Sequence, residues 1–120
     1  MTERTAEEWG RVAVSLPGWR WMPGMRWCMP SHAPGPMRGR MVGDDPSALL
    51  LATGWPDPDD PATEGCMVRL LGPVHEAVWY TGDCDRWVVA VGEERRLYTS
   101  LGRACIAAAA AIGRWPGGEG

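Results

Sequence analysis

The stretch that decides the fold class is Glu76-Ala-Val-Trp-Tyr-Thr-Gly-Asp-Cys-Asp-Arg-Trp-Val-Val-Ala-Val91. Two runs rich in β-branched and aromatic residues, 76–81 and 86–91, flank the turn-forming Gly82-Asp-Cys-Asp85, and this pattern predicts a β-hairpin. Both faces of the second run are apolar, which is typical of a central strand covered on both sides. Leu97-Tyr98 is a candidate for a further short strand, so an antiparallel sheet is expected here.

Three segments carry apolar residues at helical spacing between a polar N-cap and a Gly or Pro stop. They are residues 6–16, 61–71 and 100–113. Asp60 followed by Pro61 is a clear helix start, because Asp caps free N–H groups and Pro suits the first helical position. Thr5 and Glu8 form a capping box before the first segment. The alanine-rich face of the last segment would let that helix lie close to a sheet.

A second hairpin is predicted where Trp19-Arg-Trp-Met22 and Met25-Arg-Trp-Cys28 flank Pro23-Gly24. Aromatic residues alternate with Arg, which indicates two short strands. A two-residue loop would place Arg20 opposite Trp27 and give each face one Arg–Trp pair for cation–π stacking. Because Pro-Gly favours a type II turn, whose twist suits a hairpin less well than the primed types, an irregular loop is the alternative.

The remaining segments complete the expected architecture. Residues 37–42 alternate in character and are a candidate strand. Residues 54–61 should form a loop, because their prolines exclude both a helix interior and a central strand. We expect one α+β domain over residues 1–115, built from a small antiparallel sheet of three to five strands with three helices in a single layer on one face. Residues 116–120 should be a flexible tail.

The composition is biased toward Arg and Trp. The chain has no Lys, Asn, Gln or Phe, but it has 8 Trp, and a GC-rich genome would explain this bias. The number of Trp and Arg residues therefore does not by itself indicate a binding surface. Placement says more: Trp9, Trp79 and Trp87 lie in a predicted helix and in the best predicted strands, so we expect them in the core.

Charge is distributed unevenly along a chain whose net charge is −3. Residues 9–43 contain arginines and no acid, whereas residues 44–64 contain acids and no base. Either these two segments lie near each other and compensate, or they form two separate surfaces of opposite sign. The negative total disfavours nucleic-acid binding by the molecule as a whole.

Three features together resemble a set of small uncharacterised proteins encoded by tailed phages and prophages. In chain order they are Trp19-Arg-Trp-Met-Pro-Gly-Met25 after a short helix, Asp60-Pro-Ala-Thr-Glu-Gly-Cys66 opening a second helix, and an alanine-rich C-terminal helix. The DPATxGC heptad is the most specific of them. The resemblance implies a phage context and no catalytic residues, because those proteins have no assigned activity. Residues 28–56 match nothing in that set and are the natural place for a protein-specific function.

Metal-binding patterns are incomplete in this sequence. Cys28 and His32 have the spacing of half a zinc site, but the other Cys and His residues form no paired second half. Asp57 and Asp59 precede Asp60 in a proline-stiffened loop that could hold a hard cation. The role of Asp60 as a helix cap explains that residue without a metal. We therefore expect no metal and no cofactor.

Catalytic patterns are also missing. The chain has no glycine-rich phosphate loop, and without Lys it has no P-loop lysine. Cys84 lies between Asp83 and Asp85, whose carboxylates would suppress the thiolate that a nucleophile requires. The four cysteines have no CxxC pair and are expected to be free and mostly buried. We therefore expect a protein without enzymatic activity.

The candidate binding residues lie in the two charged segments. They are Trp19, Arg20, Trp21, Arg26, Trp27, Arg38, Arg40, Asp57 and Asp59. Trp and Arg are the residue types most enriched at protein-interface hot spots, although part of this set could equally belong to the core. The expected function is a non-enzymatic, protein-binding accessory protein of phage or prophage type that binds a bacterial host protein. The alternative is a nucleic-acid-binding accessory factor that stacks bases on the Arg/Trp hairpin.

In the phage context, an inhibitor of a bacterial defence system such as CRISPR is the specific hypothesis. The acidic segment 57–64 would suit this role, because an acidic surface can occupy a basic nucleic-acid groove. No apolar run is long enough to span a membrane. The N-terminus carries acids where a signal peptide would carry a basic and then an apolar region. These features predict a protein without a membrane partner, located in the cytoplasm of the bacterial host.

Overall fold

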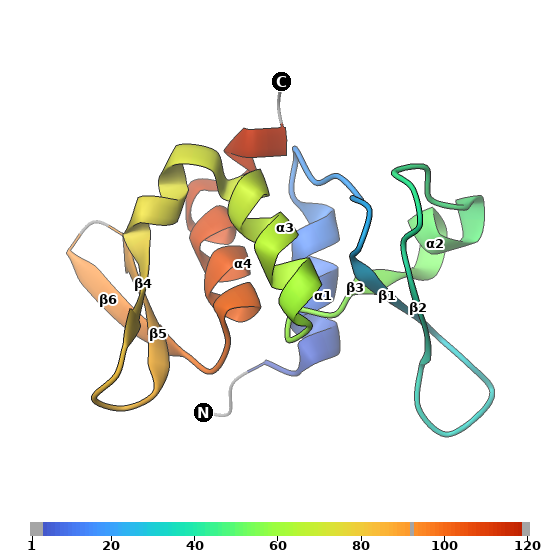
Figure 1. Cartoon of the computed structure of the whole chain (residues 1–120), viewed down its shortest axis with the longest axis horizontal. Helices are drawn as coiled ribbons and strands as arrows, with labels where there is room; N and C mark the ends of the chain where they lie inside the picture. Colours follow the sequence, from blue (N-terminus) through green and yellow to red (C-terminus); the bar gives the residue numbers. More distant parts are fainter. Residues whose placement is uncertain (1–3, 92, 119–120) are drawn as a thin grey trace.

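Three of the helices occupy the centre of the molecule, and a three-stranded antiparallel sheet lies on either side of them (Figure 1). This arrangement comes from a computed structural model that describes residues 4–91 and 93–118. The α-helices are α1 (Ala6–Ser15), α2 (Ala48–Thr53), α3 (Pro61–Leu71) and α4 (Leu101–Ile112), and the 3₁₀ helices are η1 (Gly72–Ala77) and η2 (Pro116–Gly118). The strands are β1 (Arg26–Met29), β2 (Met37–Arg40), β3 (Trp55–Pro56), β4 (Val78–Thr81), β5 (Arg86–Val91) and β6 (Glu94–Tyr98).

The α+β class is confirmed, and so are the three predicted helices, within two residues at each end. Their caps form as expected: Thr5 and Glu8 make a capping box, and the Asp60 side chain accepts a hydrogen bond from the Thr63 N–H. The expected single sheet is wrong, because the strands divide between a first sheet in the order β2-β1-β3 and a second sheet in the order β4-β5-β6. Helices α1, α3 and α4 form the layer between them (Figure 1). An apolar run without a predicted assignment forms α2, which Ser47 caps.

The second sheet confirms the hairpin that decides the fold class. Strand β5 pairs with β4 and with β6, so it is the central strand, as its apolar faces predict. The register aligns Trp79, Val88 and Leu97 in one row across the three strands. Side chains alternate between the two faces of a sheet, so Trp87 and Val89 lie on the opposite face. That opposite face packs against α4 and the core.

The predicted hairpin around Pro23-Gly24 is wrong, and the irregular loop is what forms. Strand β1 pairs with β2 instead, across the loop at residues 30–36. The Gly24 N–H donates to the Met41 carbonyl at 2.9 Å, and the Met41 N–H donates to the Met25 carbonyl at 2.8 Å. Met25 is fully buried, so the core takes the side chain that the hairpin model would place beside the turn. Tertiary packing overrides the local alternation here.

The first sheet is short and depends on its neighbours. Strand β3 has two residues, lies at the sheet edge and contains Pro56, whose missing N–H is tolerated at an edge. It lies against α1 so closely that a Cβ on Gly10 would come within 3.0 Å of the Trp55 side chain and the Pro56 carbonyl. Residues 54–61, expected to be loop throughout, therefore contribute a strand. Trp55 is buried there.

The C-terminal segment is part of the core. Trp115 is fully buried, and its Nε1–H donates to the Ala13 carbonyl at 3.0 Å. The backbone of η2 packs on α3, where Gly117 leaves no room for a Cβ beside the Arg69 carbonyl. Residues 116–118 of the predicted tail are thus packed, and residues 119–120 lie outside the described residues. Within the described residues, no helix has the length and hydropathy that a membrane span requires.

Candidate functional site

The predicted tryptophan surface is largely interior. Trp19 contacts Trp21 and Trp115 edge-on, with ring centroids 5.5 Å and 5.6 Å apart. Trp21 is buried and Trp19 is half-buried. Trp27 is also half-buried, because its ring covers Gly39 of the neighbouring strand. The aromatic part of the predicted site therefore mainly stabilises the fold.

The predicted Arg–Trp stacking within residues 19–28 does not occur, because the hairpin that would align these side chains does not form. The cation–π contacts in the described residues are Arg4 on Trp9, Arg11 on Trp55 and Arg95 on Trp79. Arg20 and Arg38 are exposed, whereas the Arg26 backbone N–H donates to Thr63 Oγ1 at 2.8 Å. Arg26 and Arg40 are partners across the β1–β2 register, and Arg38 lies on the same face of this strand pair. Arg20 lies outside these strands.

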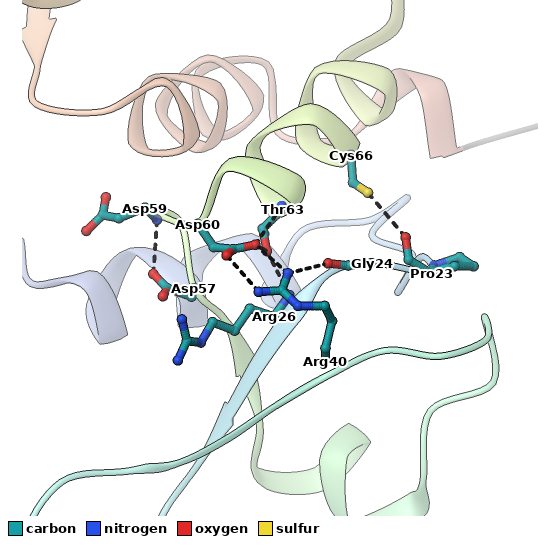
Figure 2. Close-up of polar contacts among 9 residues, drawn as sticks. All are labelled: Pro23, Gly24, Arg26, Arg40, Asp57, Asp59, Asp60, Thr63 and Cys66. Carbon is teal, nitrogen blue, oxygen red and sulfur yellow. Dashed lines mark hydrogen bonds and ion pairs between the residues drawn. The ribbon is translucent and has the colours of Figure 1, made fainter.

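Arg40 and Asp60 join the basic segment to the acidic segment (Figure 2). Arg40 Nη1 and Nη2 donate to the two Asp60 carboxylate oxygens at 3.0 Å and 3.1 Å. The hydrogen bond from Arg40 lowers the pKa of Asp60, which is buried. This pair is what the compensating interpretation of the charge pattern predicts. It commits Arg40 to the fold.

Thr63 connects the Arg40–Asp60 pair to β1. Its Oγ1–H donates to Asp60 Oδ2 at 3.0 Å while the oxygen accepts from Arg26 N–H. Nearby, the Cys66 thiol donates to the Pro23 carbonyl at 3.8 Å (Figure 2). The two segments that carry the phage resemblance, 19–25 and 60–66, therefore contact each other. Contacts between these two segments are sufficient to explain why Asp60, Thr63 and Cys66 occupy their positions.

Asp57 and Asp59 are used locally. Asp57 Oδ1 accepts the Asp59 N–H at 3.0 Å and so shapes the loop before α3. The Asp59 carboxylate accepts hydrogen bonds from Nε and Nη2 of Arg103, on α4, at 3.1 Å and 3.0 Å. Asp59 is partly exposed, so this pair is accessible at the surface. Asp59 thus faces an intramolecular arginine, whereas Asp57 shapes the loop.

The cysteines are free, and three of the four are buried. Burial raises the pKa of Cys28 and Cys66, and it raises the pKa of Cys105 to about 12. A thiol with a raised pKa is a poor nucleophile at neutral pH. Among the described residues, no three His, Cys, Asp or Glu side chains converge as a metal site would require.

The second sheet carries an exposed surface that the sequence reasoning missed. We define the outer face by the residues that the register places on it: Trp79, Thr81, Arg86, Val88, Ala90, Arg95 and Leu97. Trp79 is 40% exposed and Leu97 57%, on either side of the buried Val88. Figure 1 shows α4 beside the other face of this sheet and no helix beside the outer face. Trp79, expected in the core, is therefore a surface residue.

The apolar pattern of β5 contained the signal for this surface. Two apolar faces predict cover on both sides, but α4 covers only one of them. The guanidinium of Arg95 lies 5.9 Å from the centroid of the Trp79 ring, within cation–π range. Arg86 and Arg95 are the charged residues of the outer face, so this face is positive on a molecule of net charge −3.

The chain matches no protein-family model, and neither a curated protein nor a solved structure shows significant similarity to it.

Proposed function

We propose that this protein acts without catalysis, by binding another protein through the outer face of the second sheet. The observation that carries the proposal is the apolar row formed by Trp79, Val88 and Leu97, which is accessible at its two ends and flanked by arginines. Exposed Trp and Arg residues are enriched among the few side chains that dominate interface energies. A sheet also holds such residues in fixed positions, which lowers the entropy lost on binding.

The chemistry of the outer face indicates the chemistry of the partner. Arg86 begins β5, and Arg95, on β6, pairs with Ala90 near the other end of β5. The apolar row lies between these two arginines. A complementary surface would present an apolar contact between acidic side chains. The partner we propose is therefore a protein with an acidic patch around an apolar centre.

The resemblance to phage and prophage proteins supplies the source of the partner. In that context the target would be a bacterial host protein, and a component of a defence system such as CRISPR is the specific candidate. The acidic residues 57–64 were the reason to expect occupation of a basic groove. Since Asp59 and Asp60 are both paired with arginines, the outer face is the better-supported contact surface.

A matched pair of leucine substitutions tests the proposal. Leu97 on the outer face and Leu51 on α2 are 57% and 66% exposed, so Leu→Glu disturbs the fold equally little at either site. Tagged wild type, Leu97→Glu and Leu51→Glu are used to capture proteins from bacterial lysates, with quantitative mass spectrometry. We expect an acidic partner whose recovery falls by about tenfold or more with Leu97→Glu and is unchanged with Leu51→Glu.

Three results would contradict the proposal. The captured proteins could be the same for all variants, or a partner could be lost equally with both substitutions. Light scattering could also show a dimer that Leu97→Glu dissociates, in which case a second copy covers the outer face. A nucleic-acid gel shift that Arg20→Ala and Arg26→Ala abolish, and that weakens steeply between about 50 and about 200 mM salt, would instead favour the nucleic-acid alternative.

A further inference from the structure

A cavity of about 380 Å³ lies on the inner side of β6, behind the outer face. Its walls come from the segment before α1, from α1, from β5 and β6, and from α4. The residues that matter most are Arg4, Trp9, Arg96, Tyr98, Ala107 and Ala111. Ligand sites in proteins have volumes of about 300 to 1,000 Å³, so this cavity suits a small molecule.

The cavity exists because α4 presents alanines to it. Ala107 and Ala111 lie one helical turn apart and carry only methyl groups toward the space that Trp9 and Tyr98 border. The two aromatic rings meet edge-on, with centroids 5.7 Å apart and an interplanar angle of 79°. The resulting space has an apolar floor and an aromatic wall.

Two guanidinium groups and the Glu94 carboxylate also line this space. Arg4 lies over the Trp9 ring, 5.0 Å from its centroid. Arg96 Nη2 is 3.2 Å from Glu94 Oε2, and these side chains are 70% and 74% exposed. An ion pair so exposed contributes little, so Arg96 can turn from Glu94 to another anion at small cost.

We propose that this cavity binds a small organic anion with an aromatic or apolar body. Its carboxylate would accept hydrogen bonds from Arg96 and Arg4, and its body would pack between Tyr98 and the α4 alanines. Charge and volume both favour this ligand. Arg4 and Arg96 outnumber Glu94, the acidic residue that lines the cavity, and they stand beside an open apolar floor. A ligand of about ten to fifteen non-hydrogen atoms suits a site at the lower end of the usual range of volumes. The proposal is independent of partner binding, because β6 directs alternate residues to the two faces.

The test uses 3-phenylpropanoate as probe and 3-phenylpropan-1-ol as its neutral counterpart, in amide-detected NMR titrations of the full chain. We expect shifts that centre on Ala107, Ala111 and the Trp9 indole N–H, which is buried and has no hydrogen-bond partner among the described residues. Arg96→Ala should weaken binding by about tenfold or more, and the alcohol should bind more weakly by a similar factor. The matched control is Arg95→Ala, which removes the neighbouring arginine on the outer face and should leave the dissociation constant within about twofold.

A second variant fills the cavity. Ala111 is exposed at its rim, so Ala111→Leu should fold normally and abolish probe binding, while Ala62→Leu on α3 should not affect it. The proposal fails if the probe shifts are scattered over the surface, if acid and alcohol bind equally, or if Arg96→Ala and Ala111→Leu both bind like wild type. Leu97→Glu should bind the probe normally, so failure here and failure of the outer-face proposal are distinguishable.

Discussion

The two sheets have three strands each, but different interactions hold them together. The second sheet uses consecutive strands joined by short turns, and its rows of side chains stabilise it across the register. The first sheet gathers strands from three separate segments, and β3 adds only two residues. It depends on α1 through Trp55 and on α3 through the Arg40–Asp60 pair and Thr63.

This difference determines which side chains of each sheet remain accessible for binding. Among the candidate binding residues in and beside the first sheet, Trp27 covers Gly39, and Arg40 and Asp59 form ion pairs within the molecule. Arg38 remains exposed. In the second sheet local pairing is sufficient, so the outer face keeps Trp79, Leu97 and Arg95 accessible. We infer that the first sheet serves the fold and the second offers the surface for function.

The strongest test of this comparison removes one tryptophan from each sheet. Trp55 is buried between β3 and α1, with the Arg11 guanidinium 4.6 Å from its ring centroid, whereas Trp79 is 40% exposed. We expect Trp55→Ala to lower the free energy of unfolding by about 3–5 kcal/mol, because it opens a core cavity. Trp79→Ala should cost less than about 2 kcal/mol, since much of the ring is already in water. Urea unfolding of both variants measures the difference, and equal losses would remove the distinction between the sheets.

A smaller effect is expected from the carboxylate that anchors the first sheet. Asp60→Ala removes the N-cap of α3 and the partner of Arg40, and the combined loss should be about 3 kcal/mol in the free energy of unfolding. The control is Asp59→Ala, which breaks the more exposed pair with Arg103 and should cost about 1 kcal/mol or less. If Asp59→Ala lowers the free energy of unfolding more than Asp60→Ala does, the Arg40–Asp60 pair in Figure 2 is not what holds the first sheet.

The pH dependence sharpens the comparison further. The hydrogen bond from Arg40 lowers the pKa of Asp60 in the folded state, so its contribution is present above the unfolded-state pKa and is lost as pH falls through the folded-state pKa. Burial raises the pKa of Glu64, whose contribution is therefore present at low pH and is lost as pH rises. Urea midpoints from about pH 6 to about pH 2 should fall less in Asp60→Asn than in wild type, and more in Glu64→Gln. Parallel curves for all three proteins would refute this assignment.

Local signals predicted much of the fold. Helix α3 begins and ends as expected, because Asp60, Pro61 and the closing Gly72 act within one turn of each end. The β4–β5 hairpin also depends on residues close in sequence. Local signals fail in the region around Pro23. Its alternating residues resemble a strand, yet burial of Met25 and backbone pairing with Met41 decide the path of the chain. Those partners lie outside any local window.

The candidate site was less predictable than the fold. The sequence indicated Trp and Arg as the binding residue types and placed them in residues 19–40, where Trp21 is buried and Arg40 is paired. The outer face was overlooked because the apolar faces of β5 suggested complete burial. Whether a second layer covers a sheet depends on how many helices the chain can place there. No pattern within the strand carries that information.

The α+β class, the three long helices with their caps, and the hairpin at residues 78–91 follow from the sequence, because each depends on interactions over a few residues. Tertiary structure alone decided that Trp115 donates to Ala13, that Arg40 neutralises Asp60, and that α4 leaves the outer face uncovered. These outcomes join segments 20 to 102 residues apart. Residues distant in sequence determine whether a side chain is buried by contacts within the molecule or remains accessible to a partner.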